Sequence, residues 1–341
     1  MCARAEIRDV LDPDSSSFLN ESTILKWSDA KLMELVKCFE PEHVEGLLTK
    51  LRRGQLQAEG AVADGRSPAA IMEDFTTTLS WRNLYYSLNG TVLLQNVSGY
   101  IKPGMLVAVL GGPDAGITTL LDILAQRAPV GGSSGGQLLG DIFVNRRPPD
   151  ATFGRRVGYV KKDDIHLPQL TVAETLYFSA RLRNPHMSRR VAFVRVALIM
   201  KLLGLLHTWS TPIGDDLIRG ISGGEKRRVS FGVELVAGLQ TLIADLPTNG
   251  LDSTSALSLL HVYKSMTRIG RAMICSLVQP SPYIFALLDM VSCFSFRSYF
   301  FLCFSPFSPL GPQKQPQIRA RVARLVRIAR RSMCSVTKSL I

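Results

Sequence analysis

The chain has 341 residues, of which 46% are hydrophobic and 20% are charged. This length suits one large α/β domain or two ordinary ones, and the composition excludes whole-chain disorder, collagen-like fibres and coiled coils. The net charge of +12 is uneven, because nine Arg or Lys and no Asp or Glu follow residue 289, which leaves +3 for residues 1–289. The basic character therefore belongs to the C-terminal segment and says little about the body.

The six cysteines are widely separated and form no C-x-x-C pair, which argues against a zinc ribbon or redox motif and fits a reducing compartment. The first residues, MCARAEIRDVLDPD, carry acids where a secretory signal needs a basic end and an apolar core, so we expect no cleaved targeting segment. We expect no transmembrane helix either. The charge-free stretches 272–288 and 298–313 fall short of the roughly 20 apolar residues that cross a bilayer.

The N-terminal part of the chain changes from helical to β-type patterning. Apolar residues at helical spacing predict two short amphipathic helices within 24–56, and 60–67 reads as a linker. Residues 76–101 carry β-type segments. A turn at 102–104 is followed by the apolar run 105–110, which predicts a buried strand. The sheet of the domain is therefore expected to begin near residue 76.

Strands and helices then alternate along the chain. The glycine- and serine-rich residues 131–140 are expected to form a flexible connection before a short strand at 141–145. The later predicted elements are helices at 170–183 and 191–206, a buried strand at 241–245, a helix from 253 and a strand at 272–278. This alternation predicts an α/β fold with a parallel sheet covered on both faces.

The pattern stops after residue 291. Within 318–333, apolar residues share one helical face and arginines occupy the others, so this basic segment suits anionic lipid or nucleic acid phosphates. The alternative is a translated sequence that was never selected to fold. The predicted organisation is a helical N-terminal extension and linker at 1–75, one domain at 76–290, and a basic tail at 291–341 that is disordered or amphipathic.

A glycine loop follows the predicted strand at 105–110. Gly111 and Gly116 stand at the spacing G-x-x-x-x-G-K-[ST] of a phosphate-binding loop, and Thr118 fills the hydroxyl position that would hold Mg²⁺. Ile117 occupies the lysine position, so a charged contact worth about 1.5 to 3 kcal/mol is lost. The alternative is a plain glycine turn between strand and helix. The candidate phosphate-binding residues are Gly111, Gly112, Pro113, Asp114, Ala115, Gly116, Ile117, Thr118 and Thr119.

Two later segments strengthen the phosphate interpretation. Ser222 and Glu225 have the spacing of a capping box, and the glycines between them would let a phosphate approach the start of a helix. Asp245 ends a buried strand, where its carboxylate could hold a metal-bound water. We therefore add Ser222, Gly223, Gly224 and Glu225 to the candidate nucleotide-binding residues and Thr118 and Asp245 as the candidate Mg²⁺ pair.

In this order, the three segments resemble the nucleotide-binding domain of ABC transporters. The match is Walker A at 111–119, the family signature at 222–225, Walker B ending at Asp245 and the D-loop at 250–252. The neighbouring sequences GEKRRVSFGVEL and PTNGLDSTSA are similar to the G subfamily, in particular the N-terminal domain of full-size pleiotropic drug resistance pumps. The resemblance covers about residues 78–290, and the chain then looks like a truncated member of that family.

The resemblance carries implications for fold, cofactors and partners. It implies a P-loop NTPase-like parallel sheet with an antiparallel β subdomain and an α-helical signature subdomain. ATP and Mg²⁺ would be the cofactors. The partners would be a second nucleotide-binding domain, packed head to tail, and transmembrane domains that this chain lacks; nucleic acid is not expected among them. The chain would be membrane-associated on the cytoplasmic side, supporting ATP-driven export.

Four positions depart from the family pattern. The Walker A lysine is Ile117, the Q-loop glutamine is Lys162, the glutamate after Walker B is Leu246 and the switch histidine is Val278. All four groups would serve the ATP bound by this chain's own Walker A, and each typically supplies roughly 10² or more in rate. We therefore assign no catalytic residue. The intact signature implies the non-catalytic half of an asymmetric pair, which lends Ser222 and the following glycines to a partner's ATP.

Two smaller expectations concern single side chains. The resemblance implies that Tyr85 or Tyr86 stacks on adenine, although strand aromatics are more often part of a core. His166 is expected on the surface, without a catalytic role.

Three alternatives stay open at this stage. The chain could be an active ATPase, in which Lys161 or Lys162 reaches the phosphates and Glu225 or Asp252 acts as the base. It could bind nucleic acid or a membrane surface through the arginines of 319–331. It could also be a truncated product without a function of its own.

Overall fold

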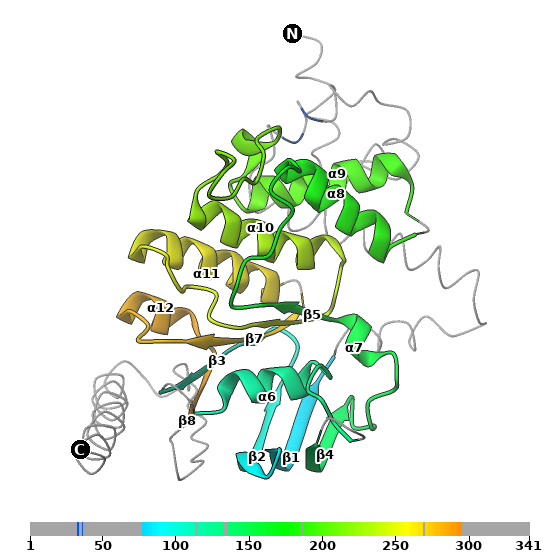
Figure 1. Ribbon diagram of the computed structural model, residues 1–341, viewed down its shortest axis with the longest axis vertical. Coiled ribbons are helices and arrows are strands. Elements are labelled where there is room, and N and C mark those ends of the chain that lie inside the picture. Colours follow the sequence, from blue (N-terminus) through cyan, green and yellow to red (C-terminus); the bar gives the residue numbers. More distant parts are fainter. Residues whose placement is uncertain are drawn as a thin grey trace.

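The computed structural model describes residues 77–112, 115–131, 135–185, 187–268 and 270–294, together with Met33 and Val36 (Figure 1). The strands are β1 Leu79–Leu88, β2 Thr91–Ile101, β3 Leu106–Gly111, β4 Gly136–Val144, β5 Val157–Val160, β6 Thr241–Ala244, β7 Ala272–Leu277 and β8 Met290–Phe294. The helices are α6 Ile117–Leu124, α7 Phe153–Arg156, α8 Val172–Arg183, α9 Arg189–Leu202, the 3₁₀ helix η2 Leu206–Thr208, α10 Gly223–Val236, α11 Ser253–Arg268 and α12 Pro282–Leu287.

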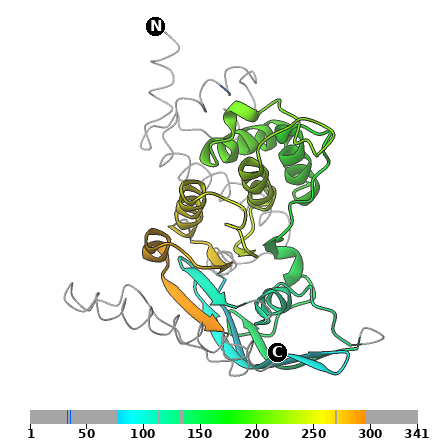
Figure 2. The same cartoon turned by 60° about the vertical axis from the view of Figure 1, so that its left-hand side comes forward.

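The strands form two sheets. One is parallel, with the order β5-β6-β7-β3-β8, and the other is antiparallel, with the order β2-β1-β4. In both views the antiparallel sheet lies at one end of the described body and helices α8 to α10 lie at the other (Figures 1 and 2). The predicted α/β fold, with a parallel sheet, an antiparallel β subdomain and a helical subdomain, is confirmed.

The parallel sheet is buried on both faces, and this explains its sequence. In β3, Leu106, Ala108 and Leu110 belong to one core, while Val107 and Val109 belong to a second core on the other face. A strand covered on both sides needs apolar residues at every position rather than at alternate ones. The first core is completed by α8 to α12, and the second by α6 and the antiparallel sheet.

Two of the helices that lie at the end opposite the antiparallel sheet begin with a capping box. Thr171 and Glu174 form a reciprocal capping box at α8, and Ser222 and Glu225 form one at α10. Each box satisfies amide groups that the first helical turn leaves without an intrahelical partner. The capping box predicted at Ser222 is therefore confirmed, and it fixes where α10 begins.

The prediction for 131–140 was wrong in its second half. Strand β4 begins at Gly136 and pairs antiparallel with β1, so residues 136–140 of the expected loop are strand. Glycine at position 140 fits a bulge in this pairing, because it has a φ of +97° and a Cβ there would lie 2.5 Å from the carbonyl oxygen of Asn83. The glycines indicated close backbone approach inside a sheet rather than a flexible connection.

The ends of the domain are described in part. Met33 and Val36 are both helical, and Val36 is buried in the first core. Strand β8 pairs with β3, so regular structure continues through Phe294, past the boundary predicted at 290. The rest of the predicted N-terminal helices, the linker and the basic tail lie outside the described residues. Within the described part of the chain, no helix has the length and apolarity needed to span a bilayer.

Candidate functional site

The phosphate-binding loop lies between β3 and α6, on the side of the sheet that faces the second core. Gly111 ends β3, and Gly116 caps α6 with a φ of +81° and no side-chain hydrogen bond. A Cβ at Gly116 would lie 2.6 Å from the carbonyl oxygen of Leu93, so only glycine fits. Among the described residues no side chain caps this helix, so the first-turn amides at 117–119 are available to a phosphate. Pro113 and Asp114 lie outside the described residues.

Ile117 is turned toward the protein. Its side chain packs against the second core, and its Cδ1 atom lies 2.8 Å from where a Cβ on Gly111 would stand. Ala115, on the same loop, is buried beside it. The residue at the lysine position therefore closes the space under the loop and offers no charge to a phosphate.

The two residues predicted to hold Mg²⁺ meet in the structure. The Thr118 hydroxyl donates to Oδ2 of Asp245 over 2.9 Å, and Asp245 is only 2% exposed. The other oxygen, Oδ1, accepts from the hydroxyl of Ser276 over 2.6 Å. Ser276 lies in β7, between β6 and β3, where it aims the carboxylate of Asp245 toward α6.

These residues fit a magnesium nucleotide at the level of ligand chemistry. Mg²⁺ prefers oxygen ligands and is usually held by one or two protein oxygens together with phosphates and water. The Thr118 hydroxyl and the Asp245 carboxylate supply such oxygens beside the uncapped start of α6. Thr118 and Asp245 would therefore hold the ion, and the amides of α6 would hold the phosphates.

The signature residues form the exposed start of α10. Ser222 and Gly223 are exposed, and a Cβ on Gly223 would meet no atom within 4 Å. Glu225 accepts from Ser222 through Oε2, while Oε1 pairs with His207 over 2.8 Å. Partial burial acts to raise the pKa of Glu225, but the hydrogen bonds from Ser222 and His207 outweigh it and lower the pKa. Gly224, half-buried, completes an open, glycine-lined helix start.

The phosphate loop and the signature lie on opposite faces of the parallel sheet. Helix α6 packs on β2 and β3 and belongs to the second core, whereas α10 packs on α8, α9 and β5 and belongs to the first. Figure 1 shows the sheet and α11 between them. The phosphate loop and the start of α10 are therefore separated from each other within this chain.

The other three positions that depart from the family pattern lie at the ends of neighbouring strands. Lys162, after β5, is exposed. Val278, after β7, is 60% exposed. Leu246, two residues after the end of β6, has a φ of +45°, which is a strained conformation for a bulky side chain. The backbone at the position where the family resemblance implies a glutamate is thus held in a special geometry.

The carboxylates weighed as substitute bases are engaged elsewhere. Asp252 lies directly before α11 and accepts hydrogen bonds from the amides of Ser255 and Thr254 in the first turn of that helix. Hydrogen bonds from these residues lower the pKa of Asp252. Glu225 is committed to the capping box and to His207. Of the two aromatic candidates for adenine, Tyr86 is 1% exposed and donates to the carbonyl oxygen of Pro129, so its ring belongs to the core.

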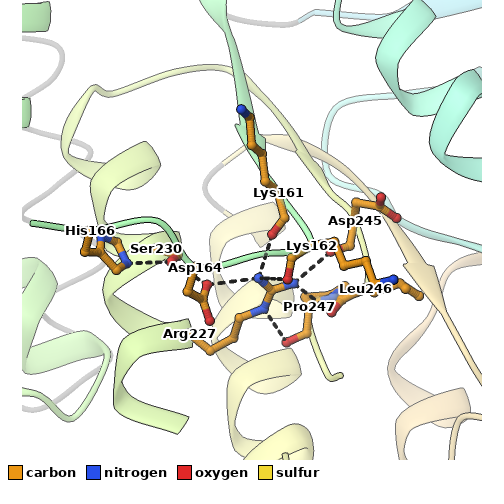
Figure 3. Close-up of polar contacts among 9 residues, drawn as sticks. All are labelled: Lys161, Lys162, Asp164, His166, Arg227, Ser230, Asp245, Leu246 and Pro247. Carbon is orange, nitrogen blue, oxygen red and sulfur yellow. Dashed lines mark hydrogen bonds and ion pairs between the residues drawn. The ribbon is translucent and has the colours of Figure 1, made fainter. Parts of the chain in front are cut away.

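Sequence reasoning missed Arg227, the best-connected polar side chain of the described site. Figure 3 shows it between the segments that follow β5 and β6, with dashed contacts to both. Its position on α10 carried a signal, because Arg227, Phe231 and Leu235 are spaced by four and share the buried face. Ser276 was missed too, although a serine in an otherwise apolar strand indicates a polar partner.

His166 is not the surface residue that we expected. It is half-buried, and its Nε2 atom lies 2.7 Å from the hydroxyl of Ser230, which donates to Asp164 over 2.6 Å (Figure 3). Burial is the main cause that lowers the pKa of His166, and the positive charge of Lys226 adds to it, while Asp164 acts to raise it. The neutral form is therefore favoured in the folded chain.

This shift predicts a loss of stability in mild acid. The unfolded chain binds the proton more readily than the folded chain, so the free energy of unfolding should fall as the pH drops below the ordinary histidine pKa of 6.5. His166→Gln should flatten this dependence, measured as urea unfolding between pH 5 and 8. The control is His261→Gln, which makes the same exchange at an exposed residue outside this hydrogen-bond network. An unchanged slope in His166→Gln would contradict the assignment.

Comparison with known proteins agrees with this geometry. Residues 94–249, which span the phosphate loop, the signature and Asp245, match the family model described as ABC transporter. The chain contains an ABC transporter domain. It is 40% identical over 215 residues to the ABC multidrug transporter SNQ2 of Candida glabrata and 39% identical over 201 residues to ABC transporter G family member 21 of Arabidopsis thaliana. It is also 40% identical over 220 residues to the ABC multidrug transporter H of Aspergillus fumigatus.

These matches place the ABC domain in the G-type and pleiotropic drug resistance group. They cover 61%, 59% and 63% of this chain but only 14%, 29% and 15% of the three relatives, respectively. The chain thus corresponds to the ATP-binding part of much longer transporters. ABC domains of this family bind ATP with Mg²⁺ and work at the cytoplasmic side of a membrane together with a second such domain and membrane-spanning domains.

Proposed function

We propose that this ABC domain binds MgATP, hydrolyses it orders of magnitude more slowly than a complete site, and lends its signature to ATP held by a partner domain. The observation that carries the proposal is the placement of α6 and α10 on opposite faces of one sheet. A signature on the far face cannot close over its own phosphate loop, so each half-site needs a second domain, packed head to tail.

The asymmetry of the residues supports the division of roles. The first turn of α10 keeps its capping box and open glycines, so the signature half is complete. The phosphate half keeps Thr118 and Asp245 but has an apolar residue at the lysine position and no carboxylate after Asp245. Without that cation and that base, the transition state for hydrolysis loses its main stabilising groups.

The relatives suggest the setting of this activity. The names of two of them describe multidrug transporters, and we extend this to the present chain as support for export of drugs or lipids across a membrane. The domain would act at the cytoplasmic side, joined to a second ABC domain and to membrane-spanning domains. Hydrolysis in the partner's site, completed by Ser222, Gly223 and Gly224 of this chain, would drive the transport.

The signature role is tested with a partner that depends on it. The partner is an ABC domain with an intact Walker A lysine and catalytic glutamate, whose own signature serine has been changed to arginine. Mixed with the full chain, it should hydrolyse ATP. Ser222→Arg should lower that rate at least about 10²-fold, because a bulky cation replaces the hydroxyl and fills the space beside the glycines.

A helix cap elsewhere supplies the control. Ser188 caps α9 through its hydroxyl, as Ser222 caps α10. Ser188→Arg should therefore cost a similar stability, about 1 kcal/mol, without lowering the partner's hydrolysis. Equal rates with Ser222→Arg and the unchanged chain would contradict the proposed function.

A further inference from the structure

Arg227 joins three segments of the site through one buried side chain. Its side chain is 3% exposed, and all three of its nitrogens donate hydrogen bonds (Figure 3). The acceptors are the carbonyl oxygens of Lys161 (2.6 Å), Lys162 (3.0 Å), Asp245 (2.7 Å), Leu246 (2.7 Å) and Pro247 (3.2 Å) and the carboxylate of Asp164 (3.0 Å). The arginine thus ties α10 to the segments that follow β5 and β6.

A continuous polar path leads from the phosphate loop to this arginine. Thr118 donates to Asp245, whose other oxygen accepts from Ser276. The Ser276 hydroxyl also accepts from the amide of Leu246 over 2.6 Å, and the carbonyl oxygen of Leu246 accepts from Arg227. The path crosses the sheet that separates the phosphate loop from the signature helix, and its steps are hydrogen bonds joined through the backbone of Leu246.

The strained residue on this path makes it sensitive to small movements. Leu246 holds a φ of +45° while its amide and carbonyl groups are fixed from opposite sides. Such a conformation persists only where the surroundings determine it. A change in the carboxylate of Asp245 would therefore reach the carbonyl of Leu246 and, through it, the guanidinium on α10.

We propose that Arg227 is a positioning residue through which MgATP at this chain's own phosphate loop sets the signature helix that serves the partner. This inference rests on the proposed function and gives the degenerate site a regulatory role. Nucleotide bound there would not need to be hydrolysed. It would bias the start of α10, which lies four residues before Arg227, toward the arrangement that closes over the partner's ATP.

The coupling is measured by hydrogen exchange of amides in the full chain, with and without saturating MgATP. In the unchanged chain, bound nucleotide should slow exchange within 222–229 about fivefold or more. Arg227→Lys keeps the charge but loses the fork of donors. It should bind MgATP with an affinity within about threefold of the unchanged chain and lose most of the response in 222–229. Arg228→Lys, the neighbouring arginine on the same helix, should keep the response.

A reverse experiment needs neither nucleotide nor the Arg227 variant. Coupling free energies are reciprocal, so loosening the signature should loosen the Walker B end. Ser222→Ala removes the cap of α10 and should raise exchange at 222–225 and also at 245–249. Its counterpart Ser188→Ala, at the start of α9, should leave 245–249 unchanged. A Ser222→Ala effect confined to the first turn of α10 would overturn the inference.

The outcomes separate this inference from the proposed function. If MgATP binds and exchange within 222–229 stays the same, or changes equally in Arg227→Lys, the inference is wrong while the signature role stands. If MgATP does not bind, the proposed ATP role of this chain is wrong, and the reverse experiment still decides whether the two segments are coupled. An Arg227→Lys variant that fails to fold leaves the decision to the reverse experiment as well.

Discussion

Restoring the four missing groups is expected to turn this chain into an ATPase. The variant combines Ile117→Lys, Lys162→Gln, Leu246→Glu and Val278→His, and its turnover should exceed that of the unchanged chain at least about 10²-fold. Most of the gain should come from the lysine, which neutralises phosphate charge, and from the glutamate, which accepts a proton from water. Phosphate release in the presence of Mg²⁺ measures the effect.

The backbone at the glutamate position supports this expectation. The main chain of Leu246 is held by hydrogen bonds, its amide to Ser276 and its carbonyl to Arg227. A glutamate at this position would therefore keep the same main-chain hydrogen bonds. Its carboxylate would extend from the backbone position that Leu246 now occupies, next to Asp245. The structure is less prepared for a lysine at position 117. Ile117 fills space under the loop, and the longer, charged side chain would have to leave the core.

The order of the reaction distinguishes a paired site from a lone one. Each copy of the restored chain carries a phosphate half and a signature half on opposite faces, so two copies packed head to tail would complete both sites. Turnover should therefore rise with roughly the square of protein concentration at low concentration, and adding Ser222→Arg should abolish it. Leu246→Gln in place of Leu246→Glu is the matched control, since it has the same shape and no base. Turnover proportional to concentration would contradict the paired arrangement.

Features set by local chemistry were predictable from the sequence. The capping box at Ser222 requires only residues three apart, and the apolar run before Gly111 requires only a strand buried on both faces. Thr118 and Asp245 were each assigned to a magnesium ion from the sequence, and they meet in the structure because the carboxyl ends of parallel strands share one edge of the sheet. In these parts of the site, the residue type and its near neighbours in the sequence were enough to predict the local structure.

Arg227 and Ser276 could not be predicted in the same way. Five of the six acceptors of Arg227 are main-chain carbonyls, which any residue supplies, and two of them lie 65 and 66 positions away in sequence. The acceptor of Ser276 lies 31 positions away, on a neighbouring strand. Only the folded sheet brings such groups together. The misjudged loop at 131–140 has a related cause, because glycine permits both flexible loops and close-packed strands.

The separation of the two half-sites follows from the alternation along β3. Alternate residues of this strand belong to the two different cores. The helix that continues from the phosphate loop packs on one face of the sheet, and the signature helix packs on the other. Within the described residues, hydrogen bonds through Asp245, Ser276 and Leu246 then connect the two segments. A domain that has lost hydrolysis can keep this connection, because none of its steps requires the missing groups.

The second large effect is expected at the glycine that begins α6. Gly116→Ala forces a side chain into a left-handed backbone conformation, which costs about 1–2 kcal/mol. The new Cβ would also stand 2.6 Å from the carbonyl oxygen of Leu93, a backbone atom that cannot rotate away. Overpacking of this kind costs about 1–3 kcal/mol more. The free energy of unfolding should fall by the sum of both, and MgATP binding should be lost because the loop must shift.

Gly131 separates the two causes within the same chain. It has a φ of +75°, close to the +81° of Gly116, but a Cβ there would meet nothing within 4 Å. Gly131→Ala should therefore lose only the conformational part, about 1–2 kcal/mol, and keep its affinity for MgATP. Urea unfolding and nucleotide titration of both variants provide the comparison. Equal losses of stability, or intact binding in Gly116→Ala, would mean that the loop does not need the close approach to β2, and its assignment as the phosphate cradle would fail.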